Sequence, residues 1–258
     1  MLTSYALEDV VMARLVLAFV NNPDGSTPSL QAQTSIIRDQ KAKWAEVVVV
    51  ISSLEKVNAM LLHAAKAAAD GDDRTYREVS KKIRDIHNSA LAVSVSNRVN
   101  FVEARREIER LISEFMRQCH FLQILNYASP WALDSIVALG ELMSALVIAS
   151  ALCNDGIAAE AVDARDIIIT NTDFGSATPL IPKTRLFTRA RVGPLLQRQV
   201  LPVITGSIGA TETGVTTSLG SEGIYYSATI IGAVMKADQI AIYTDVNNNV
   251  ATRHACCA

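Results

Sequence analysis

The chain alternates short, wholly apolar runs with longer stretches in which apolar residues recur at helical spacing. Two of the runs, 15–20 (LVLAFV) and 45–51 (AEVVVVI), are mostly continuous and rich in β-branched residues. This pattern is typical of strands that are buried on both faces of a parallel sheet. Further short strands are predicted at 161–162, 167–170, 200–205 and 239–244.

Helical patterns fill the segments between these strands. The longest of them, 56–123, is amphipathic: Leu61, Ala65 and Ala68 share one face, and the breaker Asp70-Gly71-Asp72 interrupts it. Other helices are predicted at 29–42, 134–152, 185–199 and 226–236. Because strands that alternate with helices imply a mostly parallel, open sheet covered on both faces, the sequence predicts an α/β fold.

The domain organisation is predicted to be simple. No internal repeat and no long linker divides the chain, so we expect a single domain over 1–258, with 1–13 as an N-terminal extension and 251–258 as a loose tail. The apolar stretch 135–153 is just long enough to span a membrane, but it carries Glu141 and has no basic flanks. We expect it to be a core helix, and we expect no membrane contact.

Composition excludes several classes of function. Half of the residues are hydrophobic, 19% are charged and the net charge is −2, so the chain has ample material for a core and no global attraction to nucleic acid. Aromatic residues make up 5% of the chain, which argues against a surface on which bases stack. The four cysteines have no spacing typical of a disulfide framework, which favours a reducing, cytoplasmic location.

Common catalytic and metal-binding motifs are missing from the sequence. It has no GxxxxGK[ST], GxSxG or HExxH, and no GxGxxG after a strand. His254, Cys256 and Cys257 could hold a soft metal ion, but three residues at a chain end make a weak site. We therefore predict no metal site.

A group of glycines and threonines in the last quarter of the chain is the most informative feature. Its members are Gly206, Gly209, Thr216, Thr217, Gly220 and Gly223. They lie between a predicted strand and a predicted helix, where an open α/β sheet binds ligands and where bare backbone N–H groups can hold a phosphate. The same glycines also fit ordinary connections between strands and helices, and the pattern alone leaves both interpretations open.

The order and spacing of these residues and of several other short motifs resemble the kinase domain of aspartokinases over about residues 14–250. The matching segments are 140–145 (GELMSA), 161–164 (AVDA), 174–179 (FGSATP), 206–211 (GSIGAT), 216–220 (TTSLG), 226–228 (YSA) and 244–246 (TDV). The resemblance implies the amino-acid kinase fold, a three-layer α/β/α sandwich. It also implies phosphorylation of the β-carboxylate of aspartate with ATP and Mg²⁺.

The same resemblance implies positions for the ligands. Thr244 and Asp245, together with the glycines and threonines named above, match residues on the nucleotide side, and Glu141 matches the residue that faces the amino group of aspartate. Thr244-Asp245 is also a common way to end a strand, so this match alone is not specific. The regulatory ACT domains that usually follow the kinase domain are not expected, because the chain ends where they would be approached.

The departures from the family fall on positions that contact phosphate or substrate. Where the family has Lys-Phe-Gly-Gly-Thr-Ser, residues 18–23 read AFVNNP, so the lysine is replaced by Ala18. Where it has Leu-Gly-Arg-Gly-Gly-Ser-Asp-Tyr, residues 219–226 read LGSEGIYY, so the arginine is replaced by Ser221 and a glycine by Glu222. Phosphoryl transfer depends on cations that neutralise developing charge. We therefore assign no catalytic residue.

These observations predict an aspartokinase-like protein that has lost phosphotransfer and acts as a binding, regulatory or assembly subunit, with a protein partner or as a homo-oligomer. The alternative is an ATP-dependent amino-acid kinase of the aspartate pathway with an altered active site, which would use ATP and Mg²⁺. In either case a nucleotide or a small acidic metabolite is a candidate ligand of the cleft.

Overall fold

The computed structural model describes residues 14–20, 28–54 and 56–244. Its centre is a five-stranded sheet in the order β3-β5-β2-β1-β8, in which every pair of neighbouring strands is parallel. The strands are β1 (Arg14–Phe19), β2 (Glu46–Ile51), β3 (Ala159–Val162), β5 (Leu201–Thr205) and β8 (Gln239–Tyr243). The two wholly apolar runs in the sequence thus form adjacent inner strands, as predicted.

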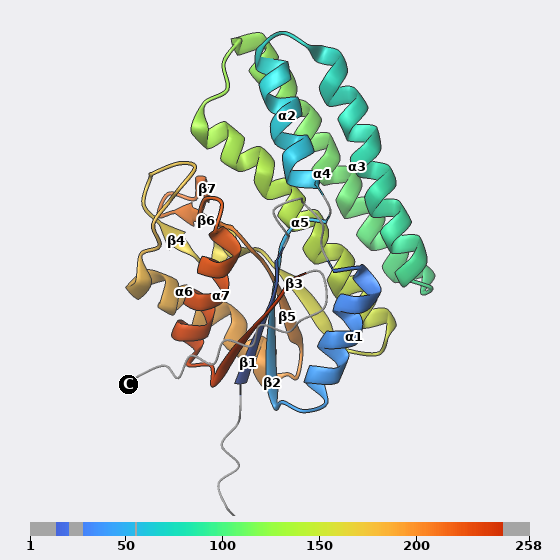
Figure 1. Ribbon diagram of the computed structural model, residues 1–258, viewed down its shortest axis with the longest axis vertical. Coiled ribbons are helices and arrows are strands. Elements are labelled where there is room, and N and C mark those ends of the chain that lie inside the picture. The colour runs from blue at the N-terminus through green and yellow to red at the C-terminus, as the bar shows by residue number, and fades with distance from the viewer. Residues whose placement is uncertain (1–13, 21–27, 55, 245–258) are drawn as a thin grey trace, which may run out of the picture.

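Helices cover both faces of this sheet and make three layers (Figure 1). The helices on one face are α1 (Leu30–Lys41) and the second half of α5 (Pro130–Asn154), and those on the other are α6 (Ile181–Gln197) and α7 (Gly223–Met235). Successive side chains of β1 point to opposite faces of the sheet. Leu17 packs in the core with α1 and α5, and Val16 packs in the core with α6 and α7. The predicted three-layer α/β/α sandwich is confirmed.

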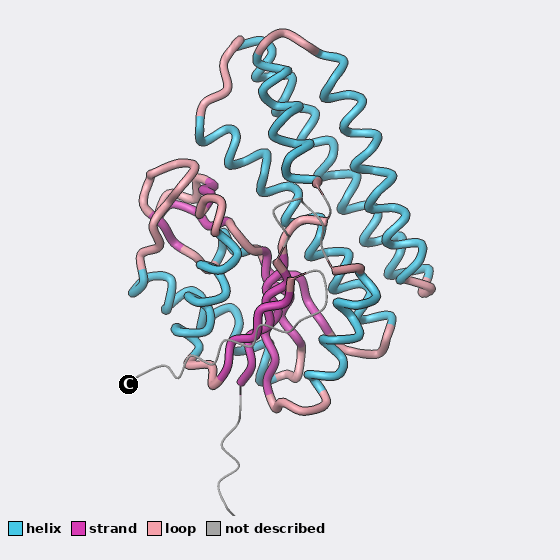
Figure 2. Tube along the Cα trace, viewed as in Figure 1, coloured by secondary structure: helices cyan, strands magenta, loops and turns pink. Residues whose placement is uncertain are grey.

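The long helical region of the sequence forms a bundle that stands beyond the end of the sheet, and Figure 2 shows the two parts clearly. It contains α2 (Val57–Ala69), α3 (Asp73–Ser94), α4 (Arg98–Leu125) and the first half of α5. The breaker in the sequence supplies the start of α3, because the Asp72 side chain accepts hydrogen bonds from the backbone N–H groups of Arg74 and Thr75.

Helix α5 is the link between the bundle and the sandwich. It is long and apolar enough to cross a membrane by length and composition, and 72% of its most apolar window is buried inside the protein. Its residues contribute to both the bundle core and the core on one face of the sheet, through Leu139 and Ile148 respectively. The prediction of a core helix is confirmed, although α5 begins at Pro130 rather than at 134, because proline is well suited to the first turn of a helix.

A second, small sheet corrects the prediction for the glycine and threonine region. Its strands, in the order β4-β6-β7, are β4 (Ile169–Thr170), β6 (Ile208–Thr211) and β7 (Thr216–Ser218). β6 and β7 form an antiparallel hairpin, so segments that the sequence suggests are turns are partly strands. The predicted strand 167–170 shortens to two residues, because the backbone N–H groups of Ile167 and Ile168 both donate hydrogen bonds to Ala164 O, in the 3-10 turn η1 (Ala164–Asp166).

Helix starts show the same kind of difference. α6 begins at Ile181, with Pro182 in its first turn, rather than at 185, and α7 begins at Gly223 rather than at 226. The predicted extension 1–13 and tail 251–258 lie outside the described residues, as do Asp245 and the weak metal-site residues near the C-terminus.

Candidate functional site

A pocket opens at the carboxyl ends of the central strands, where open α/β sheets bind ligands. Val20, Ser52 and Ser207, which follow β1, β2 and β5, line it, and Asn58 of α2 and Glu141 of α5 close one side. Its volume is about 480 Å³. We call it the inner hollow.

A second hollow of about 440 Å³ shares lining residues with the first, among them Asn58, Ser218 and Gly220. It extends between the bundle and the small sheet, and Lys66 of α2 and Asp134 of α5 line it. Because the two hollows share walls, we treat them together as the central cleft. Its volume is ample for a metabolite-sized ligand.

Glu141 is the most unusual residue of the cleft, because its carboxyl group is buried and forms no salt bridge with any described residue. The residue is 1% exposed, and its Oε1 accepts a hydrogen bond from Asn58 Nδ2 at 2.7 Å. Its Oε2 has no hydrogen-bond partner among the described residues. Burial raises the pKa of the Glu141 carboxyl from 4.5 to about 8, although hydrogen bonds from Asn58 and from the backbone of Ser53 oppose the shift. A buried acid with a free oxygen in a cleft is a candidate binding group.

Small residues beside Glu141 bring α2 and the end of β2 close to it. A Cβ atom on Gly140 would collide with Asn58 Oδ1, so the absence of a side chain there admits the Asn58 amide. One turn later, Ser144 Oγ accepts a hydrogen bond from the backbone N–H of Leu54 at 2.7 Å, which fixes the chain after β2. The sequence did not lead us to predict Asn58 or Ser144 as residues of the site. The available signal was the pair of small residues at 140 and 144, one turn apart on a core helix, which indicates that another segment packs closely there.

Asp134 connects α5 to the opposite wall of the cleft. Its Oδ2 accepts hydrogen bonds from the backbone N–H groups of Gly175, at 2.8 Å, and Ser218, at 2.9 Å. Burial raises the pKa of the Asp134 carboxyl, and these two hydrogen bonds oppose the rise. The sequence analysis missed this residue too, because both partners lie far away along the chain.

The predicted nucleotide-side glycines occupy tightly packed positions around the inner hollow. Gly206 donates a backbone hydrogen bond to Ile51 O at 2.7 Å, and a Cβ at Gly206 would collide with Ile224. A Cβ at Gly223 would lie 2.8 Å from Ser207 Cα. These glycines therefore allow the start of α7 to pack against the connection after β5. Gly220, with φ +86°, lines the hollow itself.

The other predicted residues lie elsewhere. Gly209 and Thr217 are paired with each other in the β6–β7 hairpin, and the Thr217 hydroxyl lies 2.8 Å from that of Thr170. Thr244 directly follows β8 and so lies at the same edge of the sheet as the inner hollow. The structure thus places Glu141 and Gly220 in the lining of the same cleft and places Gly209 and Thr217 within the small sheet.

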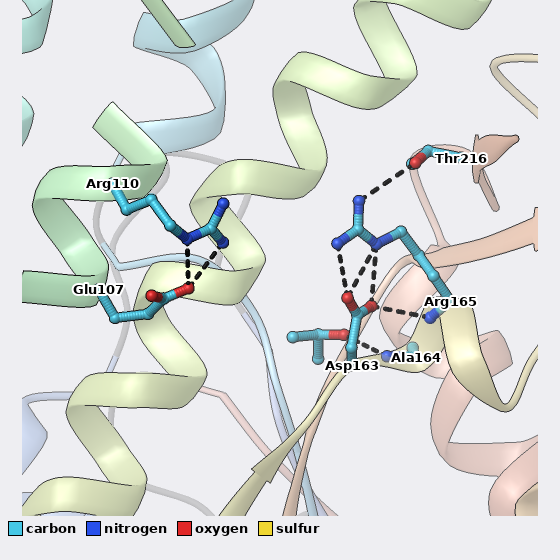
Figure 3. Close-up of polar contacts among 7 residues, drawn as sticks. Glu107, Arg110, Asp163, Ala164, Arg165 and Thr216 are labelled. Atoms are coloured by element: carbon cyan, nitrogen blue, oxygen red, sulfur yellow. Dashed lines mark hydrogen bonds and ion pairs between the residues drawn. The ribbon is translucent and has the colours of Figure 1, made fainter. Parts of the chain in front are cut away.

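Thr216 belongs to a separate polar cluster at the end of β3, which is drawn in Figure 3. Asp163 and Arg165 form a salt bridge, and Arg165 Nη1 donates a hydrogen bond to Thr216 Oγ1 at 3.3 Å. A second pair, Glu107 and Arg110 of α4, faces them across a small pocket of about 170 Å³. In this cluster each arginine already has a carboxylate partner. The hydrogen bond from Arg165, which follows β3, to Thr216 of β7 connects the small sheet to the main sheet.

Acids outnumber cations among the described side chains that line the central cleft. Glu141 and Glu222 line the inner hollow, and among the described residues no lysine, arginine or histidine does. The second hollow adds one acid, Asp134, and one cation, Lys66. No group of three or more histidine, cysteine, aspartate or glutamate side chains within 14–20, 28–54 and 56–244 could hold a metal ion. The described cleft therefore offers little to a phosphate and more to a cation.

The fold and the cleft place this protein in a structural class. Its members are three-layer α/β/α sandwiches with a cleft at the carboxyl ends of the central strands, and here a buried acid lies beside that cleft. Sequence comparison then specifies the family. The sequence model of the amino acid kinase family matches residues 22–249, and the chain belongs to this family.

Within the family, the chain is similar to aspartokinases. It is 29% identical to the aspartokinase of Chlamydia trachomatis over 244 residues, which cover 91% of this chain and 49% of that protein. It is 30% identical to the lysine-sensitive aspartokinase 3 of Escherichia coli over 199 residues, which cover 77% of this chain and 42% of that protein. The chain thus spans about half the length of the curated relatives it matches.

Solved structures agree with the sequence comparison. E. coli aspartokinase III in complex with aspartate and ADP superposes with a TM-score of 0.77 at 26% identity, and the match covers 91% of this chain and 49% of that one. The same enzyme in complex with lysine and aspartate gives a TM-score of 0.77 at 27% identity, and the match covers 90% of this chain and 49% of that one. The predicted resemblance and the predicted fold class are both confirmed.

Proposed function

We propose that this chain keeps the ligand cleft of the amino acid kinase fold without transferring phosphate, and that it acts by binding a small molecule and a protein partner in the cytoplasm. The charge of the cleft carries this proposal. In the motif resemblance to aspartokinases, Ala18 and Ser221 fall where the family has a lysine and an arginine, and Glu222 lines the inner hollow. Losing one preorganised stabilising group costs about 3–4 kcal/mol, and a carboxylate about 4 Å from a phosphate oxygen adds about 4 kcal/mol of repulsion.

Phosphotransfer provides the direct test. With ATP, Mg²⁺ and aspartate, the purified chain is expected to form no detectable aspartyl phosphate, measured by trapping the acyl phosphate with hydroxylamine. The double variant Ser221→Arg/Glu222→Gly, which restores the aspartokinase residues at these positions, is a matched comparison and is expected to increase affinity for aspartate. A turnover near 1 s⁻¹ in the unmodified chain, ordinary for a kinase, would remove the proposal.

The alternative, an amino-acid kinase with an altered active site, is favoured by one observation: Lys66 lines the second hollow and could neutralise a phosphate there. If turnover is found, Lys66→Met is expected to abolish it under this alternative. An exposed lysine outside the cleft, Lys82, provides the matched control variant.

The partner part of the proposal is supported by large, exposed apolar side chains between the end of α4 and the start of α5, which we call the tip patch; Figure 1 shows these two helix ends. The exposed fractions of its large side chains lie between 53% and 67%. They belong to Phe121, Ile124, Leu125, Tyr127 and Trp131. Large apolar groups gathered in one exposed place are typical of protein contact sites.

The free thiols Cys119 and Cys153 are compatible with a reducing cytoplasm.

Self-association through this tip patch is expected in solution. Light scattering at micromolar concentration should give a mass above that of the monomer, and the double variant Phe121→Ser/Leu125→Ser should reduce it to the monomer mass. Leu186→Ser, at an exposed leucine on α6, is the control and should leave the mass unchanged. A wild-type chain that is monomeric at these concentrations would contradict self-association by this surface.

A further inference from the structure

The inner hollow combines two acids that differ in their surroundings. Glu141, on α5, is almost fully buried, and its Oε2 has no hydrogen-bond partner among the described residues. Glu222 is exposed and lies at the N-terminus of α7, with no hydrogen bond from its side chain to cap that helix. Both line the same pocket of about 480 Å³. One acid therefore sits deep in the pocket and the other lies nearer to solvent.

An anionic ligand does not suit this arrangement. A dicarboxylic amino acid needs a cationic group for its second carboxylate, and a nucleotide needs several for its phosphates. The described lining of the inner hollow holds neither lysine nor arginine nor histidine, while Glu222 would repel either ligand. Lys66 lines the neighbouring hollow, where Asp134 accompanies it.

A metal ion does not suit it either. Calcium takes six to eight oxygen ligands, and magnesium requires an octahedral set. The described residues contain no group of three or more acidic, histidine or cysteine side chains that could supply such a set. An ammonium group needs fewer partners, because it carries three donors and can use the free Oε2 of Glu141 together with uncharged oxygens such as the Ser52 hydroxyl.

We infer that the central cleft binds a small organic dication of the aliphatic diamine class, with one ammonium on Glu141 and the other toward Glu222. This inference rests on the proposed function, because it treats the cleft as a binding site rather than as a site of phosphotransfer. This ligand differs in charge from the acidic metabolite that the sequence suggested. The relevant chemistry is two primary ammonium groups on a short carbon chain, whose methylenes can pack on Val20 and Ile224.

Titration calorimetry with defined probes tests the inference. Cadaverine should bind. Pentylamine, which has the same carbon chain and one charge fewer, should bind about 2–5-fold more weakly, and aspartate and ATP·Mg²⁺ should bind more weakly than both. Cadaverine binding no tighter than pentylamine, tighter binding of aspartate, or no binding of cadaverine at millimolar concentration would each overturn the inference.

Variants of the two acids assign the two ends of the ligand. Glu222→Gln should lower cadaverine affinity about 2–5-fold, to the level of pentylamine, and leave pentylamine affinity unchanged. Glu141→Gln should weaken both amines at least 10-fold, while Glu103→Gln, at an exposed glutamate of α4, should change neither. Equal loss of both amines in Glu222→Gln, or unchanged binding in Glu141→Gln, would contradict the proposed orientation. Circular dichroism checks that each variant is folded.

Proton release gives an independent readout. In the empty cleft burial raises the pKa of Glu141 to about 8, so the carboxyl is largely protonated at pH 7, and an incoming ammonium should expel close to one proton. The other titratable groups that line the cleft are Glu222, Tyr225, Asp134 and Lys66. Titrations in two buffers of different ionisation enthalpy measure the release. A wild-type value of zero, or the same value in Glu141→Gln, would overturn the inference.

The two proposals fail separately. Measured aspartyl-phosphate formation would remove the proposed function whatever the amine affinities are. Absence of that activity together with a preference for aspartate over cadaverine would leave the proposed function in place and overturn the diamine inference.

Discussion

Glu141→Gln is expected to stabilise the folded protein by roughly 3–5 kcal/mol at pH 9 and to have little effect at pH 4. In the folded protein burial raises the pKa of this carboxyl from 4.5 to about 8. Between these two values the folded state holds a proton that the unfolded state has released, so stability falls as the pH rises. Each pKa unit corresponds to about 1.4 kcal/mol, and a glutamine keeps an oxygen for the Asn58 amide without the charge.

Urea unfolding from pH 4 to pH 9 measures this effect. The wild-type free energy of unfolding should decline from about pH 5 to pH 8 relative to that of Glu141→Gln. Glu103→Gln, at an exposed glutamate of α4, should follow the wild type throughout. If wild type and Glu141→Gln lose stability in parallel over this interval, Glu141 is ionised in the empty cleft, and burial does not raise the pKa of its carboxyl.

His87 is expected to produce the opposite pH dependence at the acid side. This α3 residue is fully buried in the bundle, its Nδ1 lies 2.7 Å from Ile83 O, and its Nε2 has no hydrogen-bond partner in the described part of the chain. Burial lowers the pKa of the imidazole from 6.5 to about 4, and the hydrogen bond to Ile83 opposes the shift. Below pH 6.5 the unfolded state gains a proton that the folded state cannot hold, so about 3 kcal/mol of stability is lost by pH 4.

The variant His87→Leu isolates this contribution. It removes the titrating group, so the loss of stability between pH 6.5 and pH 4 should be smaller than in the wild type by about 3 kcal/mol, whatever its stability at pH 7.5. His63→Leu, at an exposed histidine of α2, is the matched control and should keep the wild-type pH dependence. An unchanged acid dependence in His87→Leu would mean that the imidazole gains its proton in the folded protein.

The two effects act over overlapping pH intervals, so their opposite slopes cancel between about pH 4.5 and pH 6.5, and together they make the empty protein less stable on either side of that interval. A cationic ligand on Glu141 would reduce the loss at alkaline pH, because it supplies a positive charge that the described residues do not place beside this carboxylate. The stability curve therefore also reports on occupancy of the cleft.

Local pattern was enough to predict the framework. Segments 15–20 and 45–51 are wholly or almost wholly apolar because strands in the middle of a covered parallel sheet are buried on both faces, and the structure pairs them as β1 and β2. Helical periodicity and the cap at Asp72 located the bundle for a similar reason. The short motifs around Glu141 resembled aspartokinases, and the family match confirms this resemblance.

Tertiary structure alone decided the small sheet and the chemistry of the cleft. The register that pairs Gly209 with Thr217 depends on contacts across the hairpin, which no local propensity specifies. Asn58 reaches Glu141 across 83 residues of sequence, and Asp134 reaches Ser218 across 84. The sequence indicates an acid, Glu141, on a core helix. The pKa of Glu141 and the unpartnered state of its Oε2 depend on groups that only folding brings around it, because desolvation depends on every neighbour in space.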